Sequence, residues 1–364
     1  MRRAHLKTGI ALALRASGGA RLVALVSGAR RLPLVIGYHR VVADRPARVR
    51  SAIPPMLVSR RMLERHLDWI GRRFRFVSLD ELGSRLESGE GLATPLAAVT
   101  FDDGYRDVYD HAFPLLARKG IPAAVFVVAD WIGNPSPLPH DRLYLLLTRA
   151  WPTARDVLSR LGVLPPGSGT PRAPSDPFSA LRLLLTTLSQ AGIARVIAAL
   201  EEQTAIDDGA LEGLRPLAWE MLAEMRRAGI TVGSHTRTHP VLTRETQPRV
   251  SAEIAGSRSA LQARLGTPID HFAYPDGAFD AEIVEAVAAA GYRFAYTTCR
   301  HRDPRHPLLT IPRRLLWENS CLDAAGRFSS AVASCLTHGV FDLARGCGQR
   351  HGAPVTARRD APDA

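Results

Sequence analysis

Short apolar runs alternate with longer amphipathic stretches along most of the chain. Short apolar runs begin near positions 34, 75, 97, 122, 230, 270 and 293, and they predict buried strands. Helical periodicity lies between several of them, at residues 59–74, 107–119, 248–265 and 279–290. Strands that alternate with helices favour a parallel sheet covered by its crossover helices. We therefore expect an α/β fold, and the 364 residues are enough for one large domain with additions.

The alternation breaks in the middle of the chain. A Pro-rich piece at 133–139 is followed by helical periodicity through 141–161 and 179–210, on either side of a Pro/Gly/Ser-rich segment at 164–177. We therefore expect a helical insertion at residues 133–215. Groove shaping, partner contact and a purely architectural role all stay open for it.

The termini differ in composition from the rest. Residues 1–31 hold basic side chains and two apolar patches, at 10–14 and 22–26, which are too short to span a bilayer. A basic amphipathic helix on the inner membrane surface is one expectation for 1–31, and an ordinary packed helix is the other. The remaining boundaries that we expect are a first part of the main domain at 32–132, a second part at 216–320, and a C-terminal extension at 321–364 with a disordered tail.

Charge and cysteines narrow the function classes only slightly. The net charge of +12 comes almost entirely from Arg, since Lys occurs only at positions 7 and 119. This basicity suits anionic lipid headgroups, so peripheral membrane contact is expected, whereas no nucleic-acid module is present. The four cysteines have no C-x-x-C spacing that would indicate a zinc knuckle or redox motif. We expect a cytoplasmic or inner-membrane-associated protein, with a periplasmic or extracellular one as the alternative.

Two segments about 130 residues apart carry the candidate chemistry. Thr-Phe-Asp-Asp-Gly-Tyr at 100–105 ends a predicted strand with Asp102 and Asp103, and Gly-Ser-His-Thr-Arg-Thr-His-Pro at 233–240 supplies His235 and His239. One carboxylate and two imidazoles can hold a zinc-like ion with a position open for water, which leaves one carboxylate as a base. Taken alone, the first segment is equally typical of a turn, and the second of surface histidines.

Together the segments resemble the first two motifs of the polysaccharide deacetylases, the NodB-homology group also called carbohydrate esterase family 4. Residues 120–126 and 219–225 extend the resemblance, and Phe-Ala-Tyr-Pro-Asp-Gly at 272–277 is similar to the third motif. The resemblance covers about residues 34–314. It implies a distorted, incomplete (β/α) barrel of the NodB type.

The resemblance also implies roles for individual residues. Asp103, His235 and His239 would hold a divalent metal, with Zn²⁺ as the first choice, and its bound water would attack an acetamide carbonyl. Asp102 would take the proton of that water, and the backbone N–H of Asp276 would complete an oxyanion site. The hydroxyl of Thr236 would brace the histidine loop, the segment 235–239 that carries His235 and His239. The expected substrate contacts are Tyr105, Tyr274 and Pro275.

The chain departs from the family pattern at the general acid. The usual late Leu-x-His motif has only a formal copy, which ends at His338. His39 follows the apolar run at 34–38 instead, and this placement resembles the circularly permuted deacetylases of poly-N-acetylglucosamine, whose acid comes from an N-terminal strand. We therefore favour His39 over His338.

The third motif departs from the pattern as well. Ala273 stands where the family has an Arg that orients the catalytic carboxylate, and Asp276 stands where it has a Tyr. Arg313 and Arg314 are candidates to replace that Arg, although surface exposure is the reading that we favour for both.

These observations predict a metal-dependent hydrolase that removes N-acetyl groups from a sugar in a polysaccharide or lipid-linked glycan. A non-catalytic glycan-binding relative and a small-molecule amide hydrolase on the same fold are the alternatives. The sugar, its linkage and the native metal stay open.

Overall fold

A computed structural model describes residues 2–19, 33–43, 52–89, 94–164, 174–342 and 351. The second apolar patch of the N-terminal segment and nearly all of the predicted disordered tail lie outside these residues.

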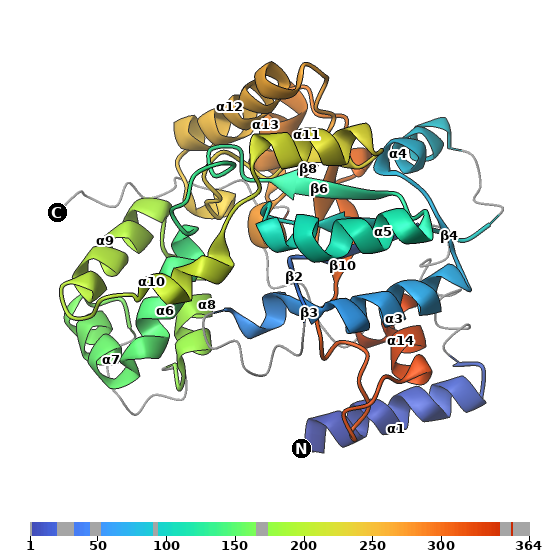
Figure 1. The fold of residues 1–364 in the computed structure, drawn as a ribbon, viewed down its shortest axis with the longest axis horizontal. Helices are drawn as coiled ribbons and strands as arrows, with labels where there is room; N and C mark the ends of the chain where they lie inside the picture. The colour runs from blue at the N-terminus through green and yellow to red at the C-terminus, as the bar shows by residue number, and fades with distance from the viewer. Residues whose placement is uncertain are drawn as a thin grey trace.

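Parallel strands close into a barrel at the centre of the molecule (Figure 1). Their order is β1-β10-β9-β8-β7-β6-β5, and β1 pairs again with β5 to complete the ring. The barrel thus has seven strands, one fewer than the eight of a complete (β/α)₈ barrel, which confirms the predicted fold class. The barrel strands are β1 (Leu34–Tyr38), β5 (Leu96–Phe101), β6 (Ala123–Val127), β7 (Thr231–Ser234), β8 (His271–Ala273), β9 (Phe294–Thr297) and β10 (Ile311–Leu315).

Three further strands lie at the margin of the barrel. β4 (Arg75–Phe76) pairs with the start of β5, whereas β2 (Arg40–Val42) and β3 (Leu57–Ser59) form a separate parallel pair. The sequence did not predict β2 and β3, because each is only three residues long and carries no clear alternation.

The strands carry the continuous apolar runs that a sheet covered on both faces requires. Every residue of β1, β5 and β6 is buried. The helices α3 (Arg60–Gly71), α4 (Leu79–Ser88), α5 (Phe113–Lys119), α11 (Trp219–Arg227), α12 (Gln247–Leu265) and α13 (Ala281–Ala289) surround the barrel (Figure 1). In α3, apolar residues recur at helical spacing, and Ser59 caps its start by accepting a hydrogen bond from the Met62 amide.

The helical insertion contains α6 (Pro139–Arg149), α7 (Trp151–Arg160), α8 (Pro177–Thr187), α9 (Gln190–Glu201) and the short α10 (Asp208–Leu211). These helices gather on one side of the barrel around an apolar cluster of their own (Figure 1). The periodic stretch predicted at 179–210 is divided, because Leu188 is extended and Ser189 caps a new helix through the Gly192 amide.

The N-terminal helix α1 (Arg2–Ala16) packs against α14 (Ser330–Thr337) near the C-terminal end of the described chain. Ala11 is fully buried in this contact, and the ammonium of Lys7 donates to the carbonyl of Ser320 at 2.9 Å. Leu6, Ile10 and Leu12 stay 65%, 41% and 54% exposed. In the described part of the chain, none of the helices combines the length and apolar character needed to cross a membrane.

Candidate metal and catalytic site

The residues of the candidate site follow the carboxyl ends of barrel strands. Asp102 and Asp103 follow β5, His235 follows β7, and His39 follows β1. The parallel strands all run in one direction, so these ends share one rim of the barrel. Two segments that are far apart in the sequence therefore meet.

The backbone of the site is locally unusual. Asp103, Thr236, His239 and Asp276 adopt positive φ angles of 72°, 68°, 64° and 53°. Non-glycine residues rarely occupy this left-handed region, and such strain concentrates at functional sites. Gly104 has a φ of 96°, which explains the glycine of the first motif.

Asp103, His235 and His239 form a cluster with ligand atoms within 4.8 Å of one another. The Nε2 atoms of His239 and His235 lie 3.2 Å and 3.6 Å from Oδ1 of Asp103. Tetrahedral zinc sites with bonds of about 2.0–2.2 Å place their ligand atoms about 3.3–3.6 Å apart. Both carboxylate oxygens of Asp103 are buried, and neither accepts a hydrogen bond of good geometry from a described residue. A divalent cation would satisfy them, so the residues fit a metal.

The backbone carbonyl of Ala273 orients His235 for this role. Its Nδ1 lies 2.7 Å from the carbonyl of Ala273, which can only accept, so Nδ1 carries the proton and Nε2 keeps a lone pair toward Asp103. Burial lowers the pKa of His235 to about 4, which keeps the ring neutral near pH 7, as metal binding requires.

Two side chains brace the histidine loop. Thr236 accepts from the amide of His239 at 3.0 Å, in agreement with its predicted bracing role, and donates to the carbonyl of His235. Glu253 of α12 is buried, and it accepts from the amides of Arg237 and Thr238 at 2.8 Å and 2.9 Å. Sequence reasoning missed Glu253, because nothing in a helical pattern shows that one of its acidic residues faces inward.

Arg313 of β10 pairs with Asp102, so the expectation of surface exposure was wrong for this residue. Its guanidinium donates to both carboxylate oxygens, at 2.6 Å and 2.8 Å, and both side chains are buried. Burial by itself raises the pKa of Asp102, but the charge and hydrogen bonds of Arg313, together with the nearby histidines, outweigh it and hold that pKa below its usual value. Strand β10 thus supplies the guanidinium that the third motif lacks. The neighbouring Arg314 is half-buried.

The register of β1 and β5 places His39 beside the aspartates. Tyr38 pairs with Phe101, and the amide of Asp102 donates to the carbonyl of Tyr38 at 2.9 Å. His39 is half-buried and interacts electrostatically with Asp102 and Asp103. His338 instead ends α14, the helix that packs on α1, and its Nδ1 contacts the carbonyl of Ser334 at 2.7 Å.

The remaining predicted contacts lie deeper than expected. Tyr105 and Tyr274 are 0% and 1% exposed, and the hydroxyl of Tyr274 donates to the carbonyl of Leu309. Neither ring offers a free face to a sugar in this structure, and Pro275 is buried too. Asp276 forms an ion pair of 3.1 Å with Arg182 of the helical insertion. The oxyanion role of its N–H stays a prediction.

The first turn of α6 brings two residues that sequence reasoning missed. His140 and Asp141 are buried, and the ring centroid of His140 lies 4.8 Å from that of His239. Burial lowers the pKa of His140 to about 3 and raises the pKa of Asp141 to about 6. The only available signal was a helix start after a Pro-rich piece, which does not reveal what the first turn faces.

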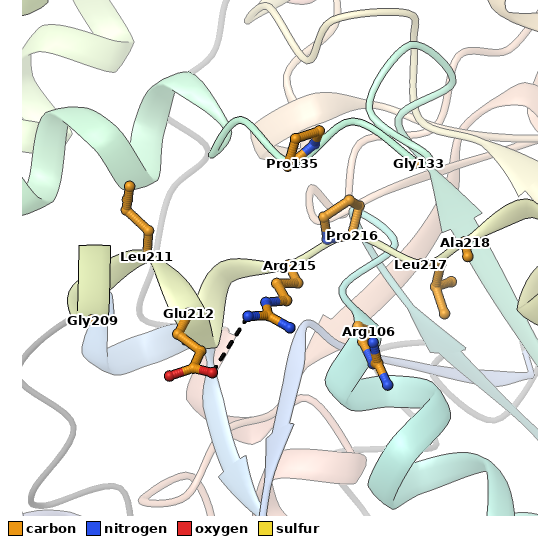
Figure 2. Close-up of a pocket in the computed structure, with 10 residues that line it drawn as sticks. All are labelled: Arg106, Gly133, Pro135, Gly209, Leu211, Glu212, Arg215, Pro216, Leu217 and Ala218. Carbon is orange, nitrogen blue, oxygen red and sulfur yellow. Dashed lines mark hydrogen bonds and ion pairs between the residues drawn. The ribbon is translucent and has the colours of Figure 1, made fainter. Parts of the chain in front are cut away.

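A surface cavity of about 560 Å³ lies where the helical insertion joins the barrel. Figure 2 shows that its wall combines Gly133 and Pro135, from the start of the insertion, with the segment 209–218 and with Arg106, which follows the first motif. Arg215 and Glu212 form an ion pair there. None of Asp103, His235 and His239 lines this cavity.

Comparisons with known proteins agree with this fold. The family model described as polysaccharide deacetylase matches residues 90–162 and 176–295, more than half of the chain. The chain therefore belongs to the polysaccharide deacetylase family, whose members are carbohydrate-modifying enzymes.

Individual relatives are more distant. The Bacillus subtilis (strain 168) protein YxkH, named as a polysaccharide deacetylase, is 25% identical over 114 residues, which cover 31% of this chain and 37% of YxkH. The matched region thus spans little more than a third of that relative.

Two solved structures share the fold. The Streptococcus pyogenes deacetylase PplD, in complex with acetate, aligns with a TM-score of 0.51 and 18% identity over 79% of this chain and 93% of PplD. IcaB from Ammonifex degensii aligns with a TM-score of 0.50 and 21% identity over 80% of this chain and 94% of IcaB. At these identities the likeness concerns the fold alone.

Proposed function

We propose that this protein is a metal-dependent N-deacetylase of an N-acetylated sugar in a polysaccharide or lipid-linked glycan. The observation that carries the proposal is the meeting of an Asp/His/His cluster with a second, separately held carboxylate. Asp103, His235 and His239 would hold the ion, while Asp102 is tied to Arg313 and stays outside the cluster. Family membership supports the carbohydrate substrate.

The reaction divides between these residues. A bound divalent ion, with Zn²⁺ as our first choice, lowers the pKa of water and polarises a carbonyl oxygen. Asp102 accepts the proton of the attacking water, and Arg313 keeps Asp102 ionised and oriented for this task. His39 then protonates the leaving nitrogen, which cannot depart as an anion. The N–H of Asp276 is the proposed donor to the developing oxyanion.

Metal analysis combined with acetate release tests the proposal. The purified protein is expected to hold one divalent ion, and His235→Ala with His239→Ala is expected to lose it, because two of three ligands are gone. Asp102→Asn is expected to keep the ion and to lose acetate release from an N-acetylglucosamine oligomer by about 10²–10⁴-fold. Metal retained by the double variant would sink the ligand assignment.

The same experiment distinguishes the alternatives. Glycan binding that survives chelation, without acetate release from any acetylated sugar, would indicate a non-catalytic relative. Acetate release from small amides, with none from oligomers, would indicate a small-molecule amide hydrolase.

We also propose a peripheral membrane contact through α1, with a cytoplasmic or inner-membrane-associated location. Its support is the exposure of Leu6, Ile10 and Leu12 on a helix of a basic segment. Co-sedimentation with anionic but not zwitterionic vesicles, lost on deletion of residues 2–16, is the expected result. Recovery in a periplasmic or secreted fraction would contradict this location.

A further inference from the structure

The helical insertion reaches the candidate site through the first turn of α6. The imidazole of His140 lies against that of His239, with ring centroids 4.8 Å apart, and it interacts electrostatically with Asp103 and His39. The insertion thus brings an additional imidazole next to both the proposed metal ligands and the proposed acid. A helix that served only to pad the barrel would not need a buried histidine and aspartate there.

Tyr105 determines which nitrogen of His140 carries the proton. The Tyr105 hydroxyl donates its single hydrogen to Oδ2 of Asp141, 2.5 Å away, because a carboxylate can only accept. The same hydroxyl oxygen lies 3.1 Å from Nε2 of His140, and with its hydrogen committed it can only accept from that atom. Nε2 therefore carries the N–H, and Nδ1 of the neutral ring keeps a lone pair.

Several neighbouring side chains contact this arrangement. The Tyr105 ring forms a T-shaped contact with Trp131, at a centroid distance of 4.9 Å, and the guanidinium of Arg40 lies 5.0 Å from the centroid of the Tyr105 ring. Arg40 directly follows His39 in the chain. Asp141 belongs to the first turn of α6, where the helix dipole favours a carboxylate. The lone pair of His140 is thus preorganised by residues of the barrel and of the insertion.

The lone pair has a natural partner in the substrate. Among the described residues, the cluster within 4.8 Å consists of Asp103, His235 and His239, so His140 stands beside it and is not a member. A sugar acetamide carries an N–H next to the carbonyl under attack, whereas a sugar acetate ester carries none. Resting on the deacetylase function proposed above, we propose that Nδ1 of His140 accepts the acetamide N–H. The helical insertion thereby selects N-acetyl over O-acetyl groups.

The chemistry balances without any added reagent. The water oxygen bonds to the carbonyl carbon while Asp102 takes the water's proton. The C–N bond then breaks as His39 protonates the nitrogen, which releases acetate and a free amine. His140 gains and loses no proton, and by holding the existing N–H it leaves the nitrogen lone pair for His39. It is a substrate-positioning residue.

A matched pair of substrates tests the inference. The value of kcat/KM is measured on an N-acetylglucosamine oligomer and on an O-acetylated sugar oligomer, for the full chain and for His140→Ala and His140→Asn. His140→Ala is expected to lose about 10- to 100-fold on the acetamide and less than about 3-fold on the ester. His140→Asn is expected to recover most of that loss, because an amide oxygen can replace Nδ1 as the acceptor.

A control variant and a binding measurement separate positioning from general damage. His39→Ala is expected to lose activity on both substrates, since an alkoxide and an amine both need a proton to leave. Calorimetry on the metal-free protein is expected to show weaker binding of the N-acetylated oligomer to His140→Ala, with unchanged binding of the deacetylated oligomer. Equal losses on amide and ester would overturn the inference, as would a folded His140→Asn that recovers nothing. Failure of the unmodified protein on both substrates would instead overturn the proposed function.

Discussion

The barrel and the helical insertion supply the candidate site from different kinds of structure. The barrel places Asp103 and His235 in the turns that follow parallel strands, whereas the insertion places His140 in the first turn of a helix. Strand ends of a closed barrel face one another by construction, so their residues can share one ion. The start of a helix outside the barrel is not fixed in this way, so its position on the rim depends on how the helix packs.

This difference indicates a division of labour. Three residues that follow barrel strands form the proposed metal site, and the insertion contacts each of the three motifs. Tyr105 of the first motif meets Asp141, Thr238 of the second meets Gln190, and Asp276 of the third meets Arg182. We infer that residues of the barrel carry out the reaction, whereas residues of the helical insertion select the substrate. The following predictions test that division, starting with the largest effect.

Replacing the proposed general acid, His39, should impair only substrates whose leaving group needs a proton. His39→Ala is expected to lose about 10²–10⁴-fold on an acetamide, because general acid catalysis contributes that much. It should stay active on an aryl acetate, whose phenolate leaves without a proton. His338→Ala serves as the control and is expected to behave like the unmodified protein in both assays. The reverse pattern would assign the acid to α14.

Replacing Arg313 should change both the pKa of the proposed base and the stability of the protein. In Arg313→Met, the pKa of Asp102 is expected to rise, since burial would act on this carboxylate without its countercharge. The acid limb of the pH profile of kcat/KM should therefore move to higher pH, with a loss of about 10–100-fold at pH 7. The free energy of unfolding should fall by about 3–5 kcal/mol, as expected when one partner of a buried ion pair is removed.

Arg314 offers a matched control on the same strand. Arg314→Met makes the same chemical change one residue away, at a half-buried position outside the pair. It should leave the acid limb in place. If the acid limb of the pH profile did not move in Arg313→Met, the pKa of Asp102 would not depend on the Arg313 guanidinium.

The stability of the barrel should fall at acid pH, independently of the candidate site. His66 of α3 is buried, and burial lowers its pKa to about 4. Because the folded state binds this proton less readily than the unfolded state, His66 contributes stability above pH 6.5 that is lost as the pH falls toward 4. The loss amounts to about 3 kcal/mol. Urea unfolding of the metal-free protein at pH 7 and pH 4 should show a smaller difference for His66→Leu, and an unchanged difference would contradict the assignment.

The contact between the insertion and the third motif should matter least. Arg182 and Asp276 form an ion pair whose side chains are 55% and 36% exposed, and pairs in water contribute little. Arg182→Ala is therefore expected to raise KM by less than about 5-fold and to leave kcat unchanged. A large fall in kcat would mean that this pair positions the backbone of the proposed oxyanion site, and the insertion would then share in the reaction itself.

Local sequence signals were sufficient to predict a strand wherever the strand was long and apolar. The runs at β1, β5 and β6 are buried on both faces, and the burial of such runs needs no knowledge of their partners. The residues that follow these strands could be placed on one rim for the same reason. Short strands such as β2 and β3 escaped, because three residues carry too little pattern.

Contacts between distant segments could not be predicted in this way. Arg313 and Arg314 are chemically equivalent neighbours, and only the pairing of β10 with β1 decides that the first of them reaches Asp102. Glu253 is one acidic residue in a polar helix until the packing of α12 turns it toward the histidine loop. No periodicity distinguishes an inward charge from an outward one.

The sequence by itself indicated the alternation of strands and helices and the four candidate residues of its two main motifs, because these depend on local pattern and on spacing. The barrel was expected only from the resemblance of those motifs to the deacetylases. The tertiary structure decided which guanidinium holds the base and which helix covers the metal cluster. Those choices depend on the closing of the barrel and on the docking of α6, which join groups more than 90 residues apart, such as Asp102 to Arg313 and His140 to His239.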